Sequence, residues 1–194
     1  MRIAVITDIH GNLPALEASL AAIDAMGVDA LCCGGDLVGY GPHPNEVCAL
    51  VEDRAIPAIH GNYDHAIGRG LDDCGCAYIT PHDRELGQRS VEWTLAHTDE
   101  RSRGFMRGLP FDLRFGHTHK PWIREHGGVL FVNCGSVGKP KDGDPRAAFA
   151  ILETAGGRVE ASIQRIPYDA ESVAREVALV GLPSEFAEKL VAAA

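Results

Sequence analysis

Four apolar runs along this chain are each followed by residues of types that commonly bind metal ions. This pattern constrains the fold more than any other feature. The first three runs are residues 3–6, 30–33 and 56–59, and the fourth precedes Gly116. The residues that follow them are, in order, Asp8 with His10, Asp36, Asn62, and His117 with His119. Unbroken β-prone runs without alternation favour strands buried on both faces. Polar side chains directly after such strands predict one shared site at the strand ends.

Helical segments separate the first strands. Leu16, Leu20 and Ile23 recur at helical spacing, and Asn12 and Gly27 are suited to begin and end that helix. A second helix fits residues 44–54. Strands that alternate with helices predict an α/β fold with a mainly parallel sheet covered on both faces.

The second half of the chain has a different rhythm. Thr80, Pro81 and Asp83 predict the start of a helix, and a shorter helix fits residues 99–107. An antiparallel meander is expected at residues 129–132, 147–152 and 159–166, followed by a helix over residues 171–180 and another capped by Ser184. We therefore expect a single domain, residues 1–194, with a helical insertion at about residues 65–110.

Composition limits the classes of function. The 194 residues are 45% hydrophobic, which is enough to fill one core, and no apolar run is long enough to span a membrane. A formal charge of -9 disfavours a nucleic-acid polymer as partner, because such binding needs an excess of Lys and Arg. The start of the chain lacks the pattern of a signal peptide, so we expect a cytoplasmic protein with reduced cysteines.

Carboxylate, amide oxygen and imidazole ligands in one site suit a borderline divalent ion such as Mn, Fe, Ni, Co or Zn. An isolated Asp-x-His or His-x-His pair is more often turn or surface chemistry, but four separate strand ends with such ligands favour a shared metal site. Cys74 and Cys76 are interpreted as a loop near the cleft, with metal binding or reactivity as the alternative. Lys139, Lys141 and Arg146 form a basic cluster that is either a solvated loop or attracts an anionic substrate.

Four ordered blocks resemble those of the calcineurin-like metallophosphoesterases, and most closely their small bacterial branch. The blocks are TDIHGN at 7–12, GGDLVGYG at 34–41, GNYD at 61–64 and GHTH at 116–119. The resemblance implies a four-layer sandwich of two mixed β-sheets flanked by helices. It also implies two divalent metal ions, the first held by Asp8, His10 and His119, the second by Asn62 and His117, and both bridged by Asp36. In such a site a metal-bound hydroxide attacks a small phosphoester.

Two departures from the family pattern affect the expected chemistry. Members usually have a histidine where this chain has Tyr63, and a tyrosine is a poorer proton donor at neutral pH. With Asp36 and Asn62, Tyr63 completes the expected catalytic set and favours a phosphodiesterase. Members also carry a His-Gly pair on a strand before the last block, and none is found here. A segment is either missing from the sequence or truly deleted; we favour the first, because losing an internal strand would expose core surface.

Two other functions stay open at this point. A scaffold that kept the fold and lost efficient catalysis, like a retromer subunit of similar fold, is favoured by the missing histidine and opposed by the otherwise intact ligand set. A phosphoprotein phosphatase is disfavoured by the small size of the chain. The sequence does not decide between a monomer and a homo-oligomer.

Overall fold

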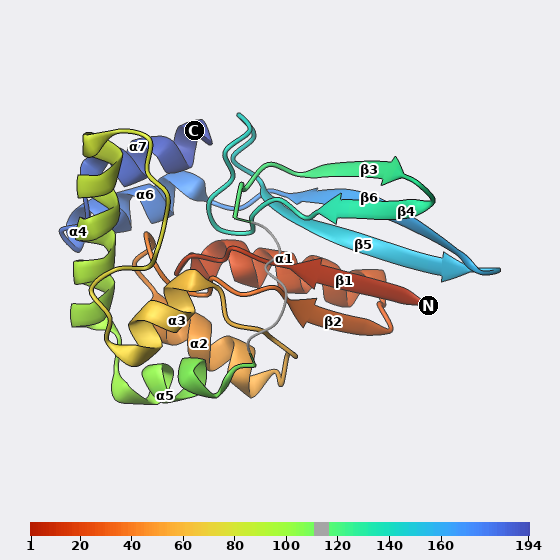
Figure 1. The fold of residues 1–194 in the computed structure, drawn as a ribbon, viewed down its shortest axis with the longest axis horizontal. Helices are drawn as coiled ribbons and strands as arrows, with labels where there is room; N and C mark the ends of the chain where they lie inside the picture. Colours follow the sequence, from red (N-terminus) through yellow and green to blue (C-terminus); the bar gives the residue numbers. More distant parts are fainter. Residues whose placement is uncertain (111–116) are drawn as a thin grey trace.

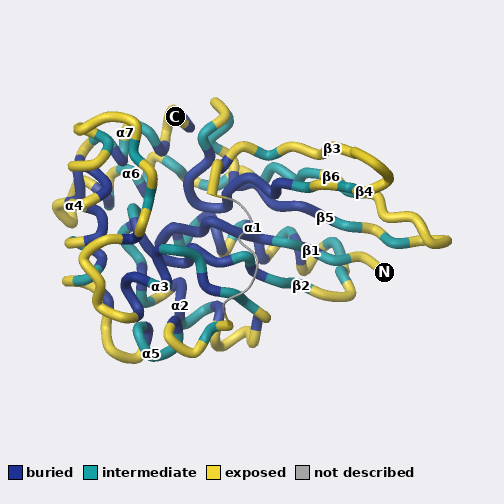
Figure 2. The backbone as a smooth tube through the Cα atoms, viewed as in Figure 1, coloured by how far each residue is buried: buried dark blue, intermediate teal, exposed yellow. Residues whose placement is uncertain are grey.

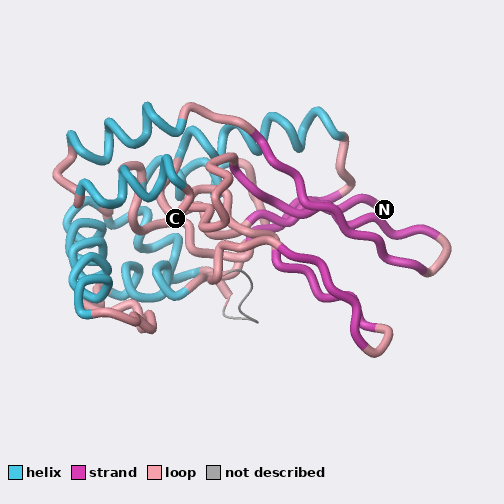
Figure 3. The backbone as a smooth tube through the Cα atoms, turned by 90° about the horizontal axis from the view of Figure 1, so that it is seen from above, coloured by secondary structure: helices cyan, strands magenta, loops and turns pink. Residues whose placement is uncertain are grey.

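The computed structural model describes residues 1–110 and 117–194, and it shows an α/β fold with two sheets (Figure 1). The strands are β1 (Arg2–Ile6), β2 (Ala30–Cys33), β3 (Trp122–His126), β4 (Val129–Asn133), β5 (Ala147–Ala155) and β6 (Arg158–Ile166). The helices are α1 (Leu13–Met26), α2 (Pro44–Asp53), α3 (Asn62–Arg69), α4 (Pro81–His97), α5 (Glu100–Gly108), α6 (Ala170–Leu179) and α7 (Ser184–Ala192). Most helices gather at one end, and the strands extend toward the other (Figure 3).

The larger sheet has the strand order β2-β1-β5-β6. β1 is parallel to β2, whereas β5 is antiparallel to both β1 and β6. The expected mainly parallel sheet is therefore wrong: within the described residues the sheet is mixed. The sheet is mixed because β5 lies beside β1 and is antiparallel to it. The third apolar run adds only a parallel bridge between Cys33 and Ala58, next to Pro57, which has no N–H to donate.

The second sheet is the antiparallel hairpin β3–β4, which diverges from the larger sheet (Figure 3). An apolar cavity of about 790 Å³ lies between the two sheets. Val5 and Ala150 line it from the larger sheet, and Leu130 and Val132 line it from the hairpin. β3, which the sequence did not predict, is exposed along its length. The expected α/β class with two sheets is confirmed, and only one hairpin of the second sheet lies in the described part of the chain.

Side-chain caps fix several helix starts at the expected places. The Asn12 side-chain oxygen accepts the N–H of Ala15 in the first turn of α1, and Gly27 ends α1 in the left-handed conformation. Thr80 likewise caps α4. Ser184 was expected to cap the last helix, and this was wrong. Pro183 holds the N-cap position, while the Ser184 hydroxyl donates to the neighbouring carboxylate of Glu185.

The core lies between the larger sheet and the helices and is the buried centre of Figure 2. Ile6, Leu16, Val51 and Phe149 are fully buried there. Each such side chain contributes about 1.5–3 kcal/mol relative to exposure to water. The loops that follow β1 and β2 begin at strands packed in this core, and the core therefore fixes the positions of their backbones. Among the described residues, no helix has both the length and the apolar character needed to cross a bilayer.

Candidate metal centre

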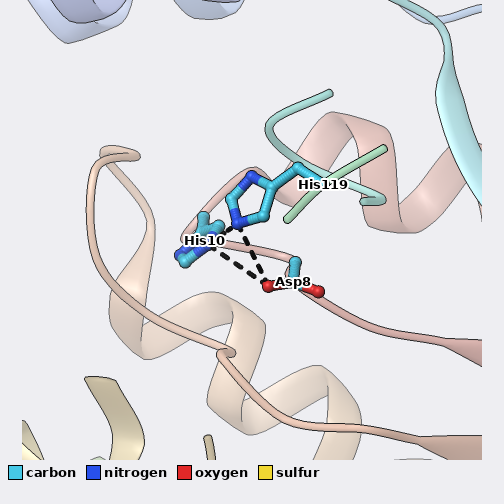
Figure 4. Close-up of side chains that lie close together, drawn as sticks. All are labelled: Asp8, His10 and His119. Atoms are coloured by element: carbon cyan, nitrogen blue, oxygen red, sulfur yellow. Dashed lines mark hydrogen bonds and ion pairs between the residues drawn. The ribbon is translucent and has the colours of Figure 1, made fainter. Parts of the chain in front are cut away.

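The loop after β1 and the loop before β3 meet at one buried point. Asp8, His10 and His119 each offer one ligand atom within 4.8 Å of the others (Figure 4). Asp8 Oδ1 lies 3.1 Å from His119 Nε2 and 3.8 Å from His10 Nε2. All three side chains are buried. The structure thus brings together the three residues assigned to the first metal, and they are able to hold one divalent ion.

The backbone fixes the tautomers of both histidines. His10 Nδ1 donates to the carbonyl oxygen of Val38 at 3.1 Å, and His119 Nδ1 donates to that of Lys139 at 2.7 Å. Because a carbonyl oxygen only accepts, the proton of each neutral ring sits on Nδ1. The two Nε2 lone pairs then face each other across 3.2 Å, next to the carboxylate of Asp8. Such converging electron pairs fit a cation.

Burial and neighbouring charge keep these rings neutral. Burial lowers the pKa of His10 well below its usual value, and His119 and Lys139 act in the same direction. Burial also lowers the pKa of His119, although Asp8 acts the opposite way. Neutral imidazole is the form that binds metals, so the protein holds both rings ready for a cation.

Backbone strain is concentrated at the expected ligands. In the described part of the chain, eight non-glycine residues have a positive φ. Five of them are expected metal ligands, namely Asp8, His10, Asp36, His117 and His119, with φ between 52° and 60°. L-residues adopt this region at a cost, and such residues cluster at functional sites. The strain supports a built site at these loops.

Asp36 lies beside the cluster, at the end of β2. Its Oδ1 accepts the N–H of Tyr63 at 2.9 Å, and its carbonyl accepts the N–H of His10 at 2.9 Å. Burial, followed by the charges of Asp64 and Asp8, raises the pKa of Asp36 well above its usual value. Buried carboxylates that repel one another are stabilised by a divalent cation.

Asp64 is the support that the sequence reasoning missed. It accepts the N–H of Leu37 at 2.8 Å and the N–H of Gly61 at 2.9 Å, so it ties the loop after β2 to the start of α3. Burial raises the pKa of Asp64 to about 6. Its position after Asn62, at the third residue of a helix that begins with a glycine cap, is a capping signal that could have been recognised.

The remaining expected site residues line a cavity of about 110 Å³ next to the cluster. Asn62, Tyr63 and His117 share this cavity with Asp36, His10 and His119. His117 is exposed, and its backbone N–H donates to Asp8 Oδ1 at 3.3 Å. The place before Gly116 where a segment was expected to be missing lies at residues 111–116, which are outside the described residues.

Tyr63 contacts the site with its ring. The side chain is 1% exposed, and its hydroxyl donates to Ser90 Oγ at 3.2 Å. Its ring lies edge-on to that of His10 with 5.7 Å between centroids. Burial raises the pKa of Tyr63 well above its usual value. These contacts favour a role for Tyr63 in packing the cavity wall.

The Cys74–Cys76 segment orients the side chain of Asn62. Asn62 Nδ2 donates to the Cys74 carbonyl at 3.1 Å and contacts Cys76 Sγ at 3.2 Å. With the amide nitrogen occupied, the amide oxygen is the free end of the group. The two thiols lie 3.1 Å apart, and the contact with Cys76 lowers the pKa of Cys74 to about 6. This segment is therefore part of the cavity wall.

The chain also matches a known family model over most of its length. Residues 1–157 match the model of the calcineurin-like phosphoesterase superfamily domain. That range contains all six expected metal ligands and Tyr63.

Individual relatives agree with the match. An uncharacterised protein of Methanocaldococcus jannaschii is 28% identical over 243 positions, which cover 97% of this chain and 96% of the relative. Because 243 exceeds the 194 residues present here, the relative has residues that this chain lacks. Phosphodiesterase YfcE of Escherichia coli is 28% identical over 79% of this chain and 88% of its own length. A metallophosphoesterase crystal structure from Sphaerobacter thermophilus superposes with a TM-score of 0.78 at 29% identity, covering 100% of this chain and 99% of that one.

Proposed function

Because the chain belongs to the calcineurin-like phosphoesterase superfamily, we propose that it is a metal-dependent phosphodiesterase that hydrolyses a small phosphoester with two divalent ions. The convergence of two imidazole Nε2 atoms and one carboxylate oxygen at Asp8, His10 and His119 carries this proposal. When bound, divalent ions would neutralise the phosphate charge and lower the pKa of water. The phosphodiesterase activity named for the relative YfcE supports a diester as the substrate.

The residues of the chain have separate roles in this proposal. Asp8, His10 and His119 would hold the first ion, Asn62 and His117 would hold the second, and Asp36 would contribute to both. Mn, Fe, Ni, Co and Zn all suit these ligands. Tyr63 shapes the cavity, since its hydroxyl is held by Ser90 and its raised pKa makes it a poor acid. A diester with a good leaving group needs little help from a protonated side chain, which agrees with the lack of a histidine at this position.

The cavity also limits the partners. A volume of about 110 Å³ admits one phosphoryl group and little more, so a small molecule is the proposed substrate. A cytoplasmic location and a homo-oligomer remain predictions from the sequence. The scaffold alternative predicts no turnover, and the phosphoprotein phosphatase alternative predicts turnover of a phosphopeptide.

The test compares an aryl diester, bis(p-nitrophenyl) phosphate, with the monoester p-nitrophenyl phosphate. Chelator-treated protein is supplied with Mn²⁺, and Asp36→Asn is measured beside wild type. Glu160→Gln, which removes one negative charge at an exposed position on β6, is the matched control. We expect Mn²⁺-dependent turnover that is faster on the diester, at least ~100-fold slower in Asp36→Asn, and unchanged in the control. No turnover when Mn, Fe, Ni, Co and Zn are each supplied in turn would reject the enzyme and favour the scaffold.

A further inference from the structure

Three of the four lysines in this chain line one cavity beside the candidate metal centre. The cavity has a volume of about 280 Å³, and its lining includes Lys139, Lys141 and Lys189. The fourth, Lys120, is exposed and does not line it. The net charge of the chain is -9, so this group of positive side chains has the opposite sign to the molecule as a whole. A local concentration of ammonium groups attracts an anion.

The lysine cavity and the metal-centre cavity are neighbours. Tyr40, Ala77, Tyr78 and Lys141 line both of them. Lys139 links them a second way, because its carbonyl accepts the Nδ1–H of His119. A single small molecule can therefore place one group at the metal centre and another in the lysine cavity.

The lysines come from two elements that pack together at this end of the fold. Lys139 and Lys141 follow β4, and Lys189 lies on α7 (Figure 1). The backbone of Gly143 donates to the carbonyl of Ala193, which ties the loop to the end of α7. The loop on one side of the cavity is therefore attached through its backbone to the helix on the other side.

The charges in the cavity are only partly balanced. Lys189 pairs with Asp83, which also lines the cavity, at 3.5 Å. Within the described residues, no carboxylate lies at ion-pair distance from Lys139 or Lys141. Lys139 is buried, with Nζ 3.1 Å from the centre of the Tyr40 ring. A buried ammonium without a counter-ion is costly, and the ring supplies only part of the compensation.

We propose that the lysine cavity binds a second phosphate group of the substrate, so that the enzyme cleaves phosphodiesters that carry another phosphate. The three lysine side chains that line the cavity outnumber its one side-chain carboxylate, that of Asp83, which suits a phosphate monoester of roughly −1.5 to −2 charge at neutral pH. Lysine binds phosphate as a point charge. A cavity of about 280 Å³ accepts a sugar phosphate but not a polymer. The inference rests on the proposed function, because it assigns the scissile group to the adjacent metal centre.

The experiment uses two substrates that differ only in the second phosphate. They are thymidine 5′-(p-nitrophenyl phosphate) and the same compound with a 3′-phosphate, assayed with the Mn²⁺-loaded full chain. We expect kcat/KM to be about tenfold or more higher for the 3′-phosphorylated compound, mainly through KM, as one charged hydrogen bond of ~1.5–3 kcal/mol allows. This ratio should fall toward one in Lys141→Gln and Lys139→Met. Lys120→Gln, the same change at the lysine outside the cavity, should keep the wild-type ratio.

A binding measurement separates this inference from the proposed function. Calorimetry compares thymidine 3′,5′-bisphosphate with thymidine 5′-phosphate on wild type and on Lys141→Gln. If neither diester is hydrolysed, the proposed function fails, and tighter binding of the bisphosphate that is lost in Lys141→Gln still supports the anion cavity. If both diesters are hydrolysed with equal kcat/KM, the cavity does not read the second phosphate and the inference is rejected. Equal binding of the two nucleotides rejects it as well.

Discussion

The two sides of the candidate metal centre are built differently. On one side Asp8, His10 and His119 are buried, and backbone carbonyls hold both rings in one tautomer. On the other side His117 is exposed, and Asn62 is held through its amide nitrogen by a loop with two cysteines. A rigid set of ligands loses little entropy when a cation binds, whereas an exposed ligand must be ordered first. In the proposed two-ion site, one position would therefore bind its ion tightly and the other more weakly.

The largest expected effect tests this difference directly, by replacing one histidine on each side. His119→Ala should lower the affinity for the tighter Mn²⁺ ion by more than ~100-fold. Removing a residue that only supports a metal ligand already lowers metal affinity by about 10–100-fold. His117→Ala should leave that ion bound and weaken only the second. Calorimetric titration of chelator-treated protein measures both affinities. If the two variants lose the same ion to the same extent, the proposed asymmetry is wrong.

A glycine beside the bridging carboxylate gives the next effect. A Cβ at Gly61 would lie 2.1 Å from Asp36 Oδ1 and 2.5 Å from the Asp36 backbone nitrogen, so Gly61→Ala must displace the loop. Overpacking of this kind costs about 1–3 kcal/mol of unfolding free energy. Gly108→Ala is the matched control, because a Cβ there meets nothing within 4 Å. Urea denaturation of both variants measures the difference. If both variants lose equally little unfolding free energy, the loop that carries Asp36 can move at low cost, and this prediction is wrong.

The buried histidines predict a pH dependence for the metal-free protein. The pKa of His10 is lowered in the folded state, so between that value and the unfolded value of about 6.5 the unfolded chain binds more protons. Stability should therefore fall as pH falls below about 6.5, with at most about 1.4 kcal/mol per pH unit from this group. His10→Gln should remove this contribution. Thermal melts at several pH values measure it, and an unchanged slope in the variant would show that His10 is not titrating on unfolding.

Local patterns in the sequence were enough to predict most elements but not how they combine. The strand at Ala30–Cys33 and the helix that Asn12 begins were predicted because caps and apolar runs are local signals. Local patterns did not predict the mixed sheet, which only the family resemblance implied, because the pairing of β1 with β5 joins segments about 150 residues apart. Strand β3 has no buried face, so its sequence carries no alternation of apolar and polar residues.

The candidate site shows the same division between local and long-range information. The expected ligands follow apolar runs, and their positions could be read from that pattern. The support from Asp64 could have been inferred in part, because its position at the start of α3 is a local capping signal, but its contact with the N–H of Leu37 is long-range. The contact between the Lys139 carbonyl and His119 Nδ1 is also long-range, and no local pattern marks it.

The smallest expected effect concerns the loop that orients Asn62. Cys76→Ala removes the sulfur that Asn62 Nδ2 contacts at 3.2 Å, so the amide loses one of two partners and can rotate. A lost hydrogen bond of ~0.5–1.5 kcal/mol corresponds to a roughly 2–12-fold weaker second Mn²⁺ ion. Cys76→Ser, which keeps an acceptor, should retain most of that affinity. Cys32→Ala, at a half-buried cysteine that contacts the carbonyl of Ala4, is the control.

In the Mn²⁺ titration the affinity for the tighter ion should be unaffected by all three changes. A loss of the tighter ion in Cys76→Ala would mean that the two sides act as one unit, because a change confined to the Asn62 side would then have reached Asp8 and its histidines.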